Sequence, residues 1–384
     1  MISQIEKFET RLIKQNLAQH REMIAICGLD DTIVKSGPFG GDVLDSVLGS
    51  ISVMGLVCFV PHPLYKEIIR LTARRVSVIS PEDCETRTFL HDVPVIADHA
   101  PGPIIKALSR RKGAVFRDGS VIARGVVTIE EAFVCASSVI HALFINYFLD
   151  YWRKIRKGHV TASDRSHFEN IVENLFPIVE SGPRLGYGPF DSESVILKEM
   201  VRAGKATVET GLVDSFFGNV SYSQKGTCHI SETGASLDEL EGAIVGVPMN
   251  GSSSVGLTAS SELGAHIGVV DKTGCRSILH GHPKFSVIAS MMCEEDGVCQ
   301  YDCYKTCPRM RDLYGVPIVS GEIGAGGLAK TLPARIKMDN GAIVYGHGVF
   351  ATGSNDFRKP FNKMVEIERM ARRFVLTECA RARH

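Results

Sequence analysis

The order of short apolar segments in the first half of this chain recurs in the second half, and this repetition limits the possible folds more than any other feature. The matching pairs are His62-Pro63 and His282-Pro283, Val93–Ile96 and Val316–Val319, Gly113–Phe116 and Gly341–Val344, and Val121–Gly125 and Val349–Gly353. Segments that recur in the same order predict duplication of a whole domain of about 180 residues.

The length and composition agree with two folded domains. A chain of 384 residues exceeds the size of a usual single core, and its 44% hydrophobic content is ordinary for globular proteins. Short β-rich runs alternate with segments of helical spacing, which predicts an α/β fold. We expect one domain over residues 1–152, a linker rich in Gly, Pro, Ser and basic residues over 153–192, and a second domain over 193–384.

Several helices are expected from apolar spacing and capping signals. The spacing predicts an opening helix over Ile5–Ile26 and a long amphipathic helix over Ile129–Trp152. Another helix is expected over Ser260–Val270. Ser236 and Glu239 form the sequence pattern of a capping box, which predicts a further helix start.

Charge and hydropathy favour a cytoplasmic protein without a nucleic-acid or membrane partner. Lys plus Arg and Asp plus Glu both number 43, so no basic surplus points to nucleic acid. The apolar stretch Val47–Val60 is too short to span a bilayer, so we expect no membrane partner. Met1–Gln15 lacks the apolar core of a signal peptide, and 11 cysteines without such a signal indicate a reducing compartment.

Three histidines have the spacing and context of a metal site. His280 and His282 lie two positions apart at the end of an expected strand, where alternate side chains share a face. His347 lies between Gly346 and Gly348 in an expected hairpin turn. Three neutral imidazoles with a fourth position left for substrate are the ligand set of an open catalytic zinc site. Another divalent metal would suit the same donors.

A candidate anion site and a candidate base precede the histidines. Ser260 and Ser261 offer hydroxyl groups beside the unpaired N–H groups of an expected helix start, which suits phosphate or carboxylate. Glu262 follows directly, and a carboxylate beside a metal can abstract a proton α to a carbonyl. Taken alone, these residues also fit an ordinary helix start, and Gly218-Asn219 and Thr233-Gly234 fit ordinary turns.

Five ordered motifs together resemble the class II aldolase/adducin family, in particular its L-fuculose-1-phosphate aldolase-like branch. They are Gly218–Ser221, Ser231–Gly234, Ser260–Glu262, His280–Pro283 and Gly346–Gly348. The resemblance covers about residues 195–384 and implies tandem three-layer αβα domains with mostly antiparallel central sheets. It implies a zinc-dependent lyase that cleaves or forms a C–C bond of a hydroxy-carbonyl substrate through an enediolate, and a homo-oligomer active in carbohydrate metabolism.

The resemblance also assigns roles to individual residues. It implies that His280, His282 and His347 bind zinc and that Glu262 is the acid/base residue. The positions that match the family's phosphate-binding residues are Asn219, Thr233, Gly234, Ser260 and Ser261. The chain departs from the family in having Glu232 where proline is frequent, and an added carboxylate there disfavours a phosphate dianion. An epimerase, decarboxylase or dehydratase with the same chemistry, and a non-enzymatic adducin-like scaffold, remain alternatives.

The first half has lost this chemistry. When the two halves are aligned on the His-Pro pair, Val60 corresponds to His280 and only His62 remains, and Gly119 corresponds to His347 on the hairpin. One histidine does not hold a catalytic zinc ion, so we expect a structural role for the first domain.

Four cysteines lie in a short insert that the family pattern does not need. Cys293, Cys299, Cys303 and Cys307 could hold a second metal or an iron–sulfur cluster. The alternatives are reduced thiols in a loop or a local disulfide. Tyr301, Tyr304 and Tyr314 are candidates for a catalytic tyrosine near the same segment.

Overall fold

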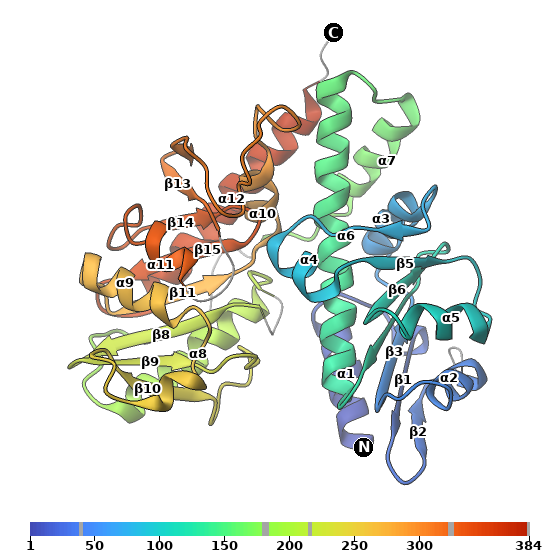
Figure 1. Cartoon of the computed structure of the whole chain (residues 1–384), viewed down its shortest axis with the longest axis horizontal. Helices are drawn as coiled ribbons and strands as arrows, with labels where there is room; N and C mark the ends of the chain where they lie inside the picture. Colours follow the sequence, from blue (N-terminus) through green and yellow to red (C-terminus); the bar gives the residue numbers. More distant parts are fainter. Residues whose placement is uncertain (38–40, 179–183, 214–216, 322–325, 382–384) are drawn as a thin grey trace. The chain divides into compact units, whose positions relative to one another are not determined.

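A computed structural model describes the chain apart from residues 38–40, 179–183, 214–216, 322–325 and 382–384 (Figure 1). The described chain separates into two compact units, the first over Met1–Phe176 and the second from Pro177 onward. Each unit has its own sheet and its own covering helices, so each is considered by itself.

The first unit is built on a sheet with the strand order β2-β1-β3-β7-β6-β5-β4. All neighbouring strands are antiparallel except β5 and β6, which run parallel. The strands are β1 (Ile24–Leu29), β2 (Ile33–Ser36), β3 (Gly55–Phe59), β4 (Val78–Ile79), β5 (Val93–Ile96), β6 (Gly113–Phe116) and β7 (Val121–Gly125).

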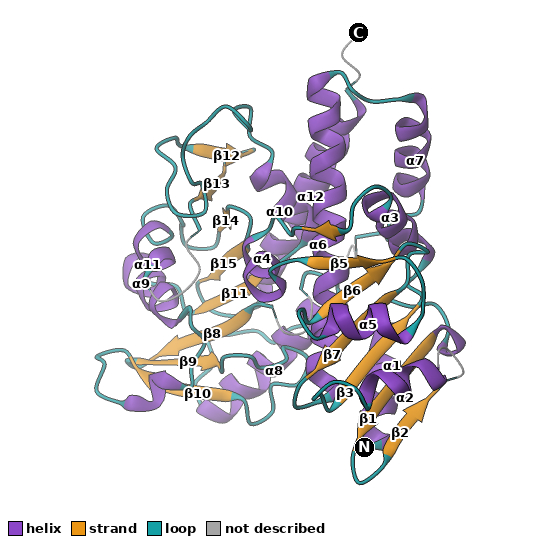
Figure 2. Cartoon of the chain, turned by 45° about the vertical axis from the view of Figure 1, so that its right-hand side comes forward, coloured by secondary structure: helices purple, strands orange, loops and turns teal. Residues whose placement is uncertain are grey.

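Helices cover both faces of this sheet (Figure 2). On one face, α2 and α5 bury Leu44, Val47 and Leu108 against strand residues such as Phe116. The other face packs against α6, which also contacts α1, α3 and α4. The helices are α1 (Ile2–Lys14), η1 (Arg21–Met23), α2 (Gly41–Leu48), α3 (Pro63–Ala73), α4 (Cys84–Leu90), α5 (Pro101–Leu108), α6 (Ile129–Lys157) and α7 (Ala162–Glu173).

Helix α6 is long and apolar enough to cross a bilayer by composition alone, yet its apolar window is wholly buried within the protein. Consecutive residues from Cys135 to Leu149 are buried, on every side of the helix. The helix predicted over Ile129–Trp152 is confirmed, but its expected amphipathic character is wrong. A helix that is apolar all round is typical of a core, and α6 is the central core helix of the first unit.

The second unit repeats this architecture with one added strand. Its sheet has the order β10-β9-β8-β11-β15-β14-β13-β12, and only β13 and β14 run parallel. The strands are β8 (Asn219–Gln224), β9 (Thr227–Ser231), β10 (Ile244–Pro248), β11 (Ser277–Gly281), β12 (Arg311–Leu313), β13 (Val316–Val319), β14 (Gly341–Val344) and β15 (Gly348–Gly353).

Helices again lie on both faces of the sheet. Ala265 and Val269 of α9 and Leu328 of α11 pack on one face with Ile278 and Phe350, while α8, α10 and α12 contact the strands from the other side. The helices are α8 (Glu193–Glu209), η2 (Ser254–Leu257), α9 (Leu263–Thr273), α10 (Lys284–Met291), α11 (Gly327–Thr331) and α12 (Arg358–Ala380).

The two sheets confirm the α/β class and the duplication expected from the repeated segments. Setting β10 aside, β9-β8-β11-β15-β14-β13-β12 corresponds strand for strand to the sheet of the first unit. The single parallel pair, β5 with β6 or β13 with β14, falls at the same place in both. The mostly antiparallel arrangement that we predicted is therefore present twice.

Three local predictions are wrong. The opening helix ends at Lys14, and Ile24–Leu29 is a central strand whose burial decides its structure more than its spacing does. No helix begins at Ser236, because Glu239 N bonds Ser236 O in a turn and Gly242 soon follows with φ of 81°. The expected linker over 153–192 contains helix α7, which packs on α3 in the first unit.

Candidate metal centre

The two histidines of the His-x-His motif come from the end of β11, in the middle of the second sheet. His280 lies on the strand, and its ring stacks on Phe350 of β15 with centroids 3.9 Å apart. His282 follows the strand, and its ring stacks on Phe217. The Nε2 atoms of the two histidines face each other at 2.9 Å, so both rings point toward one place.

The third histidine lies in the turn that joins β14 to β15. His347 is buried, and its ring centroid lies 4.9 Å from that of His280 and 4.8 Å from that of His282. Gly348 makes this approach possible, because a Cβ atom there would lie 3.0 Å from His280 Cε1 and 2.9 Å from His282 Cδ2. The glycine is needed for space beside the imidazoles.

The arrangement of these nitrogens fits a divalent metal ion. Ligand atoms of His280, His282 and His347 all lie within 4.8 Å of one another, and the residues are 1%, 3% and 2% exposed. His280 Nδ1 bonds the Val349 carbonyl at 3.0 Å, and since a carbonyl only accepts, Nδ1 carries the proton. The lone pair of His280 Nε2 therefore faces the other two rings, as a metal ligand requires.

A carboxylate lies beside the three rings. Glu262 Oε2 is 3.3 Å from His280 Nε2, and Glu262 Oε1 is 3.3 Å from His347 Nε2. Asn219 Nδ2 donates a hydrogen bond of 2.6 Å to Glu262 Oε2, which fixes the orientation of the carboxylate. The side chain of Glu262 is about 10% exposed, so it is mostly buried but still in contact with solvent.

Four of the five residues expected to hold an anion form two hydrogen-bonded pairs, and Asn219 of one pair also bonds Glu262. Asn219 Nδ2 also donates to Ser260 Oγ at 3.1 Å, and Ser261 N donates to Thr233 Oγ1 at 3.3 Å. Gly234 follows Thr233 in a turn. The helix begins at Leu263, three residues later than predicted, so Ser260 and Ser261 lie in the turn before α9 and Glu262 is its N-cap residue.

Two residues that support the site were not identified from the sequence. His266 is buried on α9, bonds Ser221 Oγ through Nδ1 at 2.7 Å, and packs edge-on against Phe350, the ring under His280. Burial lowers the pKa of His266 to about 3. The position of His266 four residues after Glu262 fits ordinary helix packing and gave no signal of this contact.

Glu368 of α12 is the second such residue. Its carboxylate accepts hydrogen bonds from Phe285 N, Ser286 N and Ser286 Oγ at 2.9, 2.8 and 2.7 Å. These donors lie in the first turn of α10, the helix that follows His282 and Pro283. Glu368 therefore caps α10 from a distant part of the chain and fixes the segment that leaves His282.

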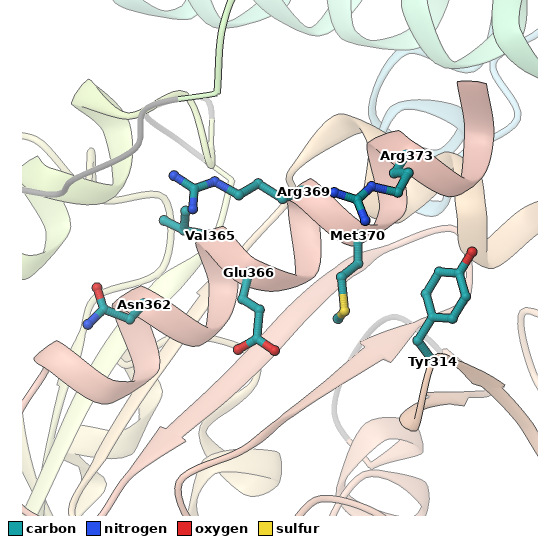
Figure 3. A pocket seen from close by; sticks show the side chains of 7 residues that line it. All are labelled: Tyr314, Asn362, Val365, Glu366, Arg369, Met370 and Arg373. Atoms are coloured by element: carbon teal, nitrogen blue, oxygen red, sulfur yellow. The ribbon is translucent and has the colours of Figure 1, made fainter. Parts of the chain in front are cut away.

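The candidate tyrosines do not converge on the histidines. Tyr301 and Tyr314 are 57% and 65% exposed, and Tyr304 packs its ring on Tyr345, next to the turn of His347. Tyr314 instead lines a separate pocket of about 560 Å³ along α12, together with Arg369 and Arg373 (Figure 3). None of the metal-centre residues lines that pocket, so it is not the candidate active site.

The sequence of most of the second unit matches a model of a known protein family. A family model described as "Class II Aldolase and Adducin N-terminal domain" matches residues 198–375. That range contains Asn219, Glu262 and the three histidines. No curated protein matches the chain.

Solved structures that resemble the chain cover about half of it. L-fuculose-1-phosphate aldolase from Thermus thermophilus is 21% identical, with 48% of this chain and 95% of that chain covered and a TM-score of 0.37. YgbL from Klebsiella pneumoniae, described as "a putative aldolase/epimerase/decarboxylase", is 25% identical, with 50% and 95% covered and a TM-score of 0.39. Its counterpart from Escherichia coli is 20% identical, with 50% and 93% covered and a TM-score of 0.40.

Proposed function

Since residues 198–375 form a domain of the class II aldolase and adducin family, we propose that the second unit is a zinc-dependent lyase. It cleaves or forms a C–C bond beside the carbonyl group of a small hydroxy-carbonyl substrate. The observation that supports this most strongly is the position of Glu262, 3.3 Å from nitrogens of both His280 and His347.

The three histidines would hold the metal, which would supply a Lewis acid for the oxygen atoms of the substrate. His280 is set for this by the Val349 carbonyl, which holds its proton on Nδ1. Phe350 and Phe217 support the rings of His280 and His282 from the side and keep their orientation.

Glu262 is the residue that moves the proton. Its carboxylate is close enough to the metal site to reach a carbon or hydroxyl group of a substrate bound there. Asn219 donates to Oε2 at 2.6 Å, which leaves Oε1, on the side of His347, for proton transfer.

Asn219, Thr233, Gly234, Ser260 and Ser261 would bind the end of the substrate that does not react. Their hydroxyl, amide and backbone N–H groups are neutral donors, which suit a carboxylate or phosphate group. Glu232 adjoins this group and pairs with Ala259 in an isolated β-bridge. Its negative charge favours a singly charged carboxylate or a neutral hydroxyl over a phosphate dianion.

The same site would serve an epimerase, decarboxylase or dehydratase, because each uses a metal-stabilised enediolate. A screen of sugar phosphates, free aldoses and hydroxy-keto acids distinguishes these reactions by their products. A non-enzymatic adducin-like scaffold is disfavoured because a scaffold has no need of three converging histidines. We further propose that the protein acts in the cytoplasm as a homo-oligomer, without nucleic-acid or membrane partners.

The test of the proposal is Glu262→Gln, measured with a substrate from that screen. The variant keeps the shape and the bond from Asn219 but cannot accept a proton. We expect unchanged metal content and a fall in kcat of about 10²–10⁴-fold. Full activity in this variant would exclude Glu262 as the base, and the absence of bound metal in the wild-type protein would exclude the lyase.

A further inference from the structure

The cysteine-rich insert between α10 and β12 differs from every other cysteine position in the chain. None of the 11 cysteines, all of which lie in the described residues, forms a disulfide. Seven are buried in the two cores, where thiols act as small apolar side chains. The four in the insert are partly exposed: Cys293, Cys299, Cys303 and Cys307. Packing therefore does not explain why thiols occupy these four positions.

The insert also lacks a core of its own. The described residues from 293 to 310 form no helix or strand. They form turns, such as the two in which Cys299 N donates a hydrogen bond to Glu295 O and Lys305 N donates one to Asp302 O. Its apolar side chains Val298 and Met310 are 79% and 82% exposed. A segment of this kind needs some other crosslink to hold one conformation, and a bound metal provides one.

Two of the four thiols are already in contact. The Cys303 thiol hydrogen-bonds the Cys307 thiol, and charge on Cys299 or Cys293 would raise the pKa of Cys303. Among the described residues, ligand atoms within 4.8 Å of one another are found for the three histidines and not for the four thiols. Binding of a metal would therefore have to draw the other two thiols toward Cys303 and Cys307.

Since four partly exposed thiols lie in an insert without a helix or strand and two of them are in contact, we propose that Cys293, Cys299, Cys303 and Cys307 bind a second, thiophilic metal centre. Three-residue gaps separate Cys299, Cys303 and Cys307, within the range found between zinc ligands. Four thiolates suit a tetrahedral zinc ion or an iron–sulfur cluster, whose ligands are the same chemical group. Binding releases the thiol protons, and the resulting thiolates are the ligands.

The position of the insert connects this centre to the histidine site. Cys307 N donates to Ser320 Oγ at 2.8 Å, just after β13, and the Tyr304 ring lies 5.2 Å from that of Tyr345. A Cβ atom on Gly346 would lie 3.1 Å from Tyr304 Cε1, so Tyr304 covers the turn that carries His347. A metal that orders the insert would therefore hold Tyr304 against this turn.

The inference does not depend on the proposed lyase function, and paired variants separate the two. We suggest anaerobic purification after expression with zinc and iron supplied, followed by measurement of zinc, iron and acid-labile sulfide per chain. Cys303→Ser with Cys307→Ser removes half of the thiol ligands. The matched control, His280→Ala with His282→Ala, removes the histidine site and leaves the insert intact.

We expect the wild-type protein to hold zinc at the histidines and a second metal at the thiols. A zinc ion in the insert gives about two zinc ions per chain, whereas a cluster gives iron, sulfide and visible absorption. The cysteine variant should lose only the second centre and the histidine variant only the first. Equal metal content in the wild-type protein and the cysteine variant would overturn the inference and leave the lyase proposal untouched.

Native thiol titration keeps the inference testable if the cysteine variant does not fold. In the wild-type protein the four insert thiols should be protected from a thiol reagent, and a strong chelator should release about four reactive thiols per chain. Immediate reaction of four thiols without the chelator, or a disulfide found between two of them by peptide mapping, would contradict a metal centre.

Discussion

The end of β11 in the second unit and the end of β3 in the first unit occupy the same place in the same strand order. In the second unit, His280 pairs in register with Asn219 of the neighbouring strand. In the first unit, Val60 and Met23 occupy these two positions, and Val60 N donates to Met23 O at 2.9 Å. The backbone pairing is the same in both units, but apolar side chains in the first unit stand where the second has a candidate metal ligand and its polar partner.

The histidine that both units share has a different task in each. His62 caps its own helix, because Nδ1 accepts a hydrogen bond of 3.4 Å from Leu64 N at the start of α3. His282 turns toward His280 instead, and α10 has no side-chain cap of its own. Glu368 of α12 supplies that cap.

The sheet can therefore form without the side chains of the candidate metal site. The same strand order forms in the first unit although it lacks the counterparts of His280 and His347, since the apolar faces and the backbone pairing decide it. The candidate metal centre instead depends on a few side chains that meet near the end of β11. Each prediction below tests one of those differences between the units.

The largest effect should come from His280→Ala, which removes the central ligand. We expect the affinity for zinc at the histidine site to fall by more than about 100-fold, since removing even a residue that only supports a ligand costs roughly 10–100-fold. Competition with a zinc chelator of known affinity measures this. The matched control is His62→Ala in the first unit, which should leave the affinity unchanged, and an equal loss in both variants would contradict the difference between the units.

Glu368→Ala should destabilise the second unit by about 3 kcal/mol, because it leaves Phe285 N and Ser286 N without their acceptor. Denaturant unfolding measures the change. His62→Ala removes the corresponding cap of α3 at a cost of about 0.5–1 kcal/mol. Equal costs in the two variants would show that Glu368 does no more for α10 than His62 does for α3.

The second unit should lose stability as the pH falls below about 6.5. Burial lowers the pKa of His266 to about 3 in the folded protein, whereas an exposed histidine titrates near 6.5. Between these values the unfolded chain binds a proton that the folded chain does not, so lowering the pH favours unfolding, by on the order of 2 kcal/mol. His266→Gln should flatten the dependence in unfolding experiments from about pH 7 to about pH 4. An unchanged slope would show that His266 is not its source.

The smallest effect should come from Val60→His, made together with His280→Ala and His282→Ala. Gly119 takes the place of His347 in the first unit, with φ of 93° and a Cβ position 2.7 Å from Lys66 O. The turn position that carries His347 in the second unit therefore carries no imidazole in the first, and we expect no gain in zinc per chain by elemental analysis. A stoichiometric gain would show that the first unit keeps more of the site than its side chains indicate.

The sequence allowed prediction of the duplication, the mostly antiparallel sheets and the convergence of His280, His282 and His347, because each depends on short motifs in a fixed order. It did not reveal Glu368, which lies 83 residues from Phe285, since nothing local marks so distant a contact. Ile24–Leu29 was read in part as helix because its apolar spacing is ambiguous and only burial between two strands decides it.

The most direct test is an anomalous diffraction measurement at the zinc absorption edge on crystals of the wild-type protein. The account predicts a zinc peak at roughly 2.0–2.1 Å from a nitrogen of each of His280, His282 and His347. It predicts no such peak beside His62 in the first unit. Zinc-supplied crystals with no peak among the three histidines would contradict the central claim.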